Sequence, residues 1–168
     1  MPTENERKYV LADPEAVLAL WDRADWDEVR QGYLPGDARI RRRTKMGRVS
    51  ETFTYKIATG GRLIEVETAL DARDFDDLWP LTDRRIHKLR RTDTDAHGLL
   101  WDIDVFLDGD GQSYLAMAEC EMPEGMAAPP AILPALVDLV RYLVPLERQA
   151  EFTNTRLSDP TCVATLKC

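Results

Sequence analysis

Charged side chains recur at alternate positions along most of the strands that this sequence predicts. In a β-strand, residues i and i+2 point to the same face, so each pair marks one charged face of a sheet. A solvated face would mix Thr, Ser and Gln with single charges, whereas charges in one phase on seven strands, paired on six of them, indicate a charged lining. The series consists of Glu4, Glu6 and Lys8; Arg39 and Arg41; Lys56; Glu65 and Glu67; Lys88 and Arg90; Asp102 and Asp104; and Glu119 and Glu121.

The residues between these charges are mainly apolar, as in Arg39-Ile40-Arg41 and Asp102-Ile103-Asp104. Two short segments, 16–21 and 71–79, carry apolar residues at helical spacing and predict amphipathic helices. We therefore expect the helices to cover the apolar face of the sheet. The charged face then points inward.

Turn residues divide the chain into eight predicted strands, with clear hairpin turns at Gly60-Gly61 and at 108–111. Eight antiparallel strands in an up-and-down order can close into a barrel and remove their exposed edges. We predict an α+β, mainly β fold: a closed eight-stranded antiparallel β-barrel, or tunnel, with short helices packed outside. The predicted strands span 3–11, 28–34, 37–44, 51–58, 62–70, 84–91, 99–107 and 112–122.

The length of 168 residues suits one domain, which we place at 1–157. A stretch rich in proline, 122–130, leads to a predicted C-terminal helical piece. Residues 158–168 are predicted to form a tail, with disorder as one expectation for it.

The charge and composition of the chain limit the partners and the location that we expect for it. A net charge of −8 and a pI of about 4.8 argue against a nucleic acid polymer. The apolar stretch 131–146 contains Pro134, Asp138 and Arg141, so we expect no membrane span. No secretory signal is recognisable, and three cysteines without CxxC spacing favour a reducing, cytoplasmic location.

The predicted lining holds six basic and eight acidic residues. Unpaired buried charges cost several kcal/mol each, so such a lumen must be wet and must serve as a site. Clustered carboxylates suit hard divalent cations such as Mg²⁺ or Mn²⁺. Clustered Lys and Arg suit phosphoryl oxygens. Together they predict a site for metal ions and a polyphosphate.

These motifs, in this order, resemble the CYTH superfamily of triphosphate tunnel metalloenzymes, and the small bacterial type in particular. The E-x-E-x-K signature is Glu4-Asn5-Glu6-Arg7-Lys8. The resemblance continues through Gln31-Gly32-Tyr33-Leu34, Arg39-Ile40-Arg41, Thr54-Tyr55-Lys56, Glu65-Val66-Glu67, Lys88-Leu89-Arg90, Asp102-Ile103-Asp104 and Glu119-Cys120-Glu121. It covers about residues 3–157.

The resemblance implies metal-dependent hydrolysis of a small-molecule triphosphate, with inorganic tripolyphosphate the expected substrate. Catalytic roles are assigned to Glu6, Lys8 and Lys56. The implied sets are Glu4, Glu6, Glu119 and Glu121 for Mg²⁺ or Mn²⁺; Arg39, Arg41, Lys56, Lys88 and Arg90 for the triphosphate; and Glu65, Glu67, Asp102 and Asp104 as additional lining.

One position departs from the family pattern, because Thr153 stands where a lysine is expected. Three alternatives therefore stay open: a thiamine triphosphatase, a class IV adenylate cyclase, and a non-catalytic module that binds polyphosphate or nucleotides. The oligomeric state is expected to be a monomer or a homodimer.

Overall fold

A single antiparallel sheet of nine strands forms the frame of the computed structural model, which describes residues 5–36, 38–60 and 62–166. The strand order across the sheet is β5-β4-β3-β2-β6-β7-β8-β1-β9. The strands are β1 Glu6–Leu11, β2 Asp27–Tyr33, β3 Arg39–Lys45, β4 Arg48–Thr59, β5 Arg62–Ala69, β6 Arg84–Thr94, β7 Leu100–Leu107, β8 Ser113–Glu121 and β9 Val140–Leu143.

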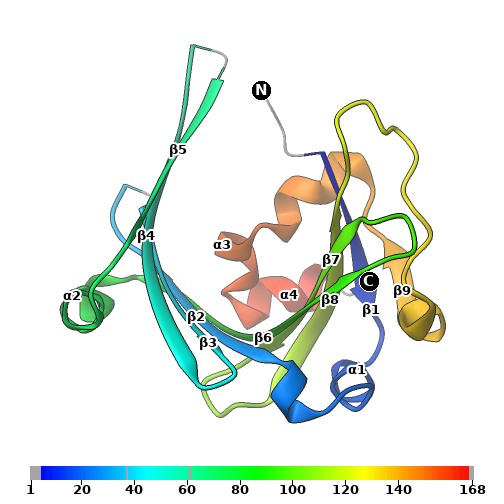
Figure 1. The fold of residues 1–168 in the computed structure, drawn as a ribbon, viewed down its shortest axis with the longest axis horizontal. Helices are drawn as coiled ribbons and strands as arrows, with labels where there is room; N and C mark the ends of the chain where they lie inside the picture. The colour runs from blue at the N-terminus through cyan, green and yellow to red at the C-terminus, as the bar shows by residue number, and fades with distance from the viewer. Residues whose placement is uncertain (1–4, 37, 61, 167–168) are drawn as a thin grey trace.

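The sheet curves into an open trough rather than a closed barrel (Figure 1). Its outermost strands are β5 and β9, and no strand pairing joins them in the part of the chain that the structure describes. The prediction of a mainly β, antiparallel fold is confirmed. The predicted closure by eight strands is not observed, because the sheet has nine strands and two free edges.

The ninth strand comes from the segment for which we predicted helical structure. Val140–Leu143 pairs with β1, with Tyr9 opposite Leu143 and Val10 opposite Tyr142. Pro134 and Pro145 bracket this segment and restrict a long helix. The β-branched and aromatic side chains between them favour a strand.

Eight short helical elements connect or cover the strands in the described residues. Aspartates cap α1 and α2: the Asp13 carboxylate accepts from two backbone N–H groups and Asp71 from one. The α-helices are α1 Pro14–Leu18, α2 Ala72–Leu78, α3 Asn154–Leu157 and α4 Pro160–Leu166; the 3₁₀ helices are η1 Arg23–Asp25, η2 Trp79–Leu81, η3 Pro134–Leu139 and η4 Leu146–Phe152.

The convex face carries the main apolar core, as the alternation predicts. Trp101, Ile103 and Val105 on β7 are fully buried there, together with Ala118 of β8 and Val17 of α1. Helix α1 packs on β7 and β8, and α2 on β3 and β4, so both lie outside the trough (Figure 1).

The C-terminal helices differ from the prediction, because α3 and α4 lie inside the trough (Figure 1). Only half of the concave face is charged. Its other half is apolar, with Val10, Phe106 and Met117 buried against Leu157 of α3 and Val163 of α4. Part of the predicted tail 158–168 is therefore a packed helix, held by the apolar area that it covers.

Strand β2 needs a glycine where it passes η2. A Cβ added to Gly32 would lie 2.6 Å from Thr82 Cγ2, which is closer than real Cβ contacts allow. None of the helices in the described ranges is both long and apolar enough to cross a membrane.

Candidate functional site

The charged half of the concave face surrounds a cavity of about 330 Å³. Strands from both arms of the trough line it, with Lys8 from β1 and Glu119 from β8 facing Arg39 from β3 and Lys56 from β4. The C-terminal segment 153–155 lines it as well. The strand alternation therefore brings residues from distant parts of the chain to one cavity.

Lys8 bridges two carboxylates on the first arm. Its Nζ lies 2.9 Å from Glu6 Oε1 and 3.0 Å from Glu119 Oε1. Burial by itself would lower the pKa of Lys8, but Glu119 and Glu6 outweigh it and raise the pKa. Lys8 is therefore a permanent ammonium at neutral pH.

Lys88 and Arg90 share the buried carboxylate of Asp104. Lys88 Nζ lies 2.7 Å from Asp104 Oδ2, and Arg90 binds both carboxylate oxygens through Nε and Nη2. Burial would raise the pKa of Asp104, but Arg90 and Lys88 hold it well below its usual range. Burial, and then the charge of Arg90, lower the pKa of Lys88 to about 8.

Two arginines on β3 lack a full set of partners. Arg39 Nε is buried and has no hydrogen-bond acceptor within the described part of the chain. Arg41 Nε donates to Gln31 Oε1 at 3.2 Å, and no described carboxylate lies within ion-pair distance of its guanidinium. Burial, and then the charges of Arg39 and Arg90, lower the pKa of Arg41 to about 10. This part of the lining therefore has an unmet need for an anion.

The four carboxylates predicted as additional lining lie on the concave face beside basic or hydroxyl groups. Glu65 Oε2 lies 3.2 Å from Lys56 Nζ, and Glu67 accepts from Thr54 Oγ1 at 2.9 Å. Asp102 pairs with Arg90, and Asp104 with both Arg90 and Lys88. These carboxylates therefore neutralise the cationic lining.

A smaller cavity of about 100 Å³ holds the oxygen donors that suit a hard divalent cation. Glu6, Asp102, Glu119 and Glu121 line it, together with Thr92. Among residues 5–36, 38–60 and 62–166, however, no three acidic, His or Cys side chains converge closely enough to form a ready-made metal site. Glu4, the fourth predicted ligand, lies outside the described residues. The donor chemistry fits the ion, and the donors would have to draw together around it.

The cationic row on β3 is longer than we predicted. Arg43 follows Arg39 and Arg41 in the same phase and pairs with Asp27 of β2. Lys45 continues this phase to the end of the strand. Extending the alternation by two more steps would have found both residues. Arg42, in the opposite phase, pairs with Glu51 and lies over the Phe75 ring outside.

Two polar residues that we did not assign also belong to this site. Gln31 is fully buried, donates to Tyr33 Oη at 2.8 Å, and holds Arg41 through its carbonyl oxygen. Asn154 Oδ1 accepts from Lys88 Nζ at 3.1 Å. Thr153, at the position of the expected lysine, lines the cavity of Lys8 and Arg39.

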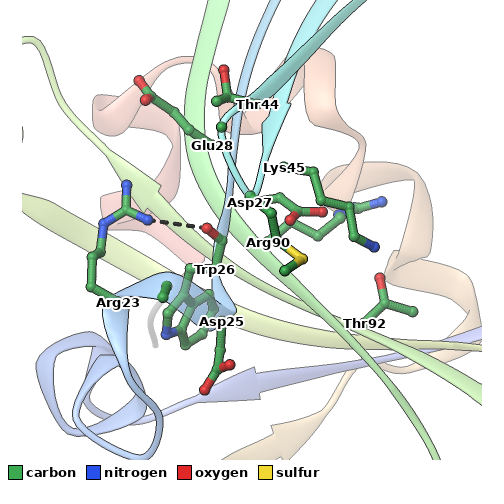
Figure 2. Close-up of a pocket in the computed structure, with 12 residues that line it drawn as sticks. Arg23, Asp25, Trp26, Asp27, Glu28, Thr44, Lys45, Arg90 and Thr92 are labelled. Carbon is green, nitrogen blue, oxygen red and sulfur yellow. Dashed lines mark hydrogen bonds between the residues drawn. The ribbon is translucent and has the colours of Figure 1, made fainter.

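A third cavity, of about 730 Å³, lies where β2 begins and where β3 and β6 end. Figure 2 shows Asp27, Lys45 and Arg90 close together in its lining, with Arg23 on the opposite side. The exposed Met46 adds apolar surface, and the largely buried Trp26 lies behind it in the lining. Because Arg90 belongs to the charged lining and Thr92 also lines the carboxylate cavity, this third cavity adjoins the charged lining.

The comparisons with known proteins agree with this geometry. The sequence is 34% identical over 108 residues to an inorganic triphosphatase of Nitrosomonas europaea, which covers 62% of this chain and 67% of that protein. The chain belongs to the CYTH superfamily of triphosphate tunnel metalloenzymes. The family assignment made from the sequence is thereby confirmed. No family model matches the sequence.

Solved structures support the CYTH fold. A crystal structure of an inorganic triphosphatase has a TM-score of 0.52 and 25% identity, over 94% of this chain and 95% of that one. A crystal structure described as a hypothetical protein gives a TM-score of 0.55 at 24% identity, over 93% and 97%. The second likeness concerns the fold alone.

Proposed function

We propose that this CYTH protein hydrolyses triphosphates on its concave face, with inorganic tripolyphosphate as the substrate. The observation that carries the proposal is the unmet donor capacity of Arg39 and Arg41 beside a cavity lined by further cations. A polyanion satisfies such donors through charge-assisted hydrogen bonds. The activity named for the Nitrosomonas relative supports the same reaction.

The phosphate chain would be held by Arg39, Arg41, Lys56, Lys88 and Arg90. Guanidinium groups bind phosphoryl oxygens in pairs, whereas lysines act as point charges. Lys8 would act with Glu6, to which it is paired at 2.9 Å, to orient a water molecule toward the terminal phosphorus. Phosphoryl transfer depends mainly on such positioning and on charge neutralisation.

In the reaction, the water oxygen forms a bond to the terminal phosphorus while the bridging P–O bond breaks. Pyrophosphate leaves with the bridging electron pair, and orthophosphate carries the new oxygen. The water must lose a proton, and Lys88 is a candidate acceptor. Its pKa of about 8 leaves a fraction of neutral amine near neutral pH.

We propose Mg²⁺ or Mn²⁺ as the cofactor, held by Glu6, Glu119 and Glu121, with Glu4 as a fourth ligand. The donor set of the small carboxylate cavity supports this choice. A bound divalent ion would supply positive charge that neutralises phosphoryl oxygens.

Tunnel closure is part of the proposal. The cavity lining includes Lys8 and Glu119 on one arm and Arg39 and Lys56 on the other. A triphosphate that contacts both arms would draw β4 and β5 toward β1, because each contact is stronger when the charges approach.

The third cavity supports a second candidate, the hydrolysis of organic triphosphates. An organic group attached to the phosphate chain could extend past Arg90 toward Trp26 and Met46. Thiamine triphosphate and ATP are the appropriate substrates to compare with tripolyphosphate. Release of cyclic AMP with pyrophosphate would indicate a cyclase, and binding without any turnover would indicate a binding module.

The test measures phosphate release from tripolyphosphate with Mg²⁺ or Mn²⁺, in the wild type and in Glu6→Gln and Lys56→Ala variants. Both variants are expected to lose activity while keeping a cooperative unfolding transition. Arg42→Ala, on the outer face of the same strand as Arg41, is the control and should stay active. Full activity in either lining variant would overturn the site assignment.

A further inference from the structure

The C-terminal segment runs inside the trough and is fixed at both ends. Phe152 and Leu157 are almost fully buried in the apolar half of the concave face. Tyr114 Oη donates to the Leu157 carbonyl at 2.7 Å, and Gln149 Nε2 donates to the Glu6 carbonyl at 2.9 Å. The residues between these anchors are therefore held in a defined position, where 153–155 line the charged cavity.

Asn154 is the member of this segment that reaches Lys88. Its Oδ1 accepts from Lys88 Nζ at 3.1 Å, while Asp104 Oδ2 accepts from the same nitrogen at 2.7 Å. Thr153 and Thr155 line the adjoining cavity, but no hydrogen bond joins either to Lys88 within the described ranges. Asn154 thus supplies a neutral acceptor from outside the sheet.

We propose that Asn154, which lines the cavity, is a positioning residue for the proposed triphosphatase reaction and holds the buried Lys88 amine through its side-chain oxygen. This inference rests on the proposed function. Asp104 alone would leave Lys88 Nζ tethered from one side, on the strand next to its own. The second acceptor, on α3 inside the trough (Figure 1), fixes the nitrogen from the concave side of the sheet. Small misplacements of a reacting group cost much of its effect.

The charge of residue 154 matters as well as its position. The charged groups that face Lys88 are Arg90 on its own strand, Asp104 on β7 and Glu119 on β8, while α3 contributes the uncharged Asn154. An anion at 154 would favour the ammonium form of Lys88. The neutral amide therefore keeps the amine available near neutral pH.

The experiment compares Asn154→Asp and Asn154→Ala with Thr155→Asp and Thr155→Ala. Each pair makes the same change of charge or size beside the same cavity, but only residue 154 contacts Lys88. We would measure the pH profile of kcat for tripolyphosphate, and the titration of the lysine amines by ¹⁵N NMR. The NMR measurement needs no activity.

Asn154→Asp is expected to move the acid limb of the kcat profile, and the titration of one lysine, upward by about one pH unit. Asn154→Ala should lower kcat roughly tenfold. Thr155→Ala removes no hydrogen bond to Lys88, so it should leave the lysine titration unchanged. Profiles and titrations that coincide for Asn154→Asp and Thr155→Asp would overturn the proposal. An inactive wild type would instead overturn the proposed function, and the lysine titration would still decide the role of Asn154.

Discussion

Lys88 Nζ lies 2.7 Å from Asp104 Oδ2, and both side chains are almost completely removed from solvent, with 3% and 1% exposed. Arg90 binds the same carboxylate, so one buried anion serves two cations. Removing one partner of a buried pair costs far more than the pair contributes, because the remaining charges stay unsolvated. Asp104 is therefore the residue of the lining on which the fold depends most.

Asp104→Ala should lower the free energy of unfolding by about 3–5 kcal/mol. Urea denaturation followed by circular dichroism measures this loss. Asp102→Asn is the control, because Asp102 is 31% exposed and pairs with one cation, Arg90, and with the Thr92 hydroxyl. It should cost less than Asp104→Ala, because Asp102 keeps part of its hydration and Arg90 keeps the Asp104 carboxylate. Equal losses for the two variants would contradict the assignment.

The buried Lys88 should make stability depend on pH in the alkaline range. Its pKa falls from 10.5 to about 8 on folding, so the unfolded chain binds more protons between these values. Stability linked to Lys88 therefore rises with pH across this window, by at most about 1.4 kcal/mol per pH unit. Lys88→Met should remove the rise. The test measures the unfolding free energies of wild type and variant from about pH 8 to pH 10. The difference between them should change with pH across this range rather than stay constant.

Replacing Arg41 should weaken the binding of the triphosphate without destabilising the fold. Arg41→Met removes a half-buried cation that has no described carboxylate partner, so the free energy of unfolding should stay equal or increase. Loss of a charge-assisted hydrogen bond to phosphate costs about 1.5–3 kcal/mol, or roughly 10- to 100-fold in kcat/KM. Arg42→Met, on the outer face, should leave kcat/KM unchanged. A destabilised, fully active Arg41→Met would refute this view.

Divalent ions should stabilise the fold through Glu121. If Mg²⁺ or Mn²⁺ binds the folded form, an ion concentration of a hundred times Kd should raise the free energy of unfolding by about 2.7 kcal/mol. Thermal unfolding with and without the ion should show the shift, and chelation should reverse it. Glu121→Gln should reduce the shift, whereas Asp76→Asn, on the outer helix α2, should not. The same shift in both variants would place the ion elsewhere.

The third cavity should select among substrates. Lys45 and Arg48 face each other across the β3–β4 turn, but only Lys45 lines this cavity. Lys45→Trp and Arg48→Trp remove the same charge, but only the tryptophan at position 45 fills the cavity. A difference in activity between the two variants therefore reports the effect of filling it. Lys45→Trp should lower kcat/KM for ATP relative to tripolyphosphate by roughly tenfold, about 1.4 kcal/mol, and Arg48→Trp should leave this ratio alone. An unchanged ratio in Lys45→Trp would show that the cavity does not receive an organic group.

Local pattern was sufficient for most of the charged lining. The alternation of Lys88-Leu89-Arg90 and Asp102-Ile103-Asp104 set which side chains share a face, because the period of a strand is two residues. It also placed Ile103 and Leu89 in the core of the convex face. Extending the same rule would have added Arg43 and Lys45.

Pairing and enclosure, by contrast, were decided by tertiary structure. The alternation marks Asp104 as lining, but only the register of β6 with β7 brings Arg90 and Lys88 to its carboxylate. The same alternation is compatible with a closed or an open sheet. Closure would require contacts between β5 and β9, whose residues lie far apart in the chain.

The position of the C-terminal segment was the feature that the sequence by itself predicted least. Its proline-rich approach and mixed composition carry no period that would place Asn154 beside Lys88. Burial of Phe152 and Leu157 in the apolar half of the trough fixes that position, and those contacts exist only after the sheet has formed. The sequence thus determined which strands carry charge and which way each charge faces. The tertiary structure decided which charges are paired, and which arginines remain available for an anion.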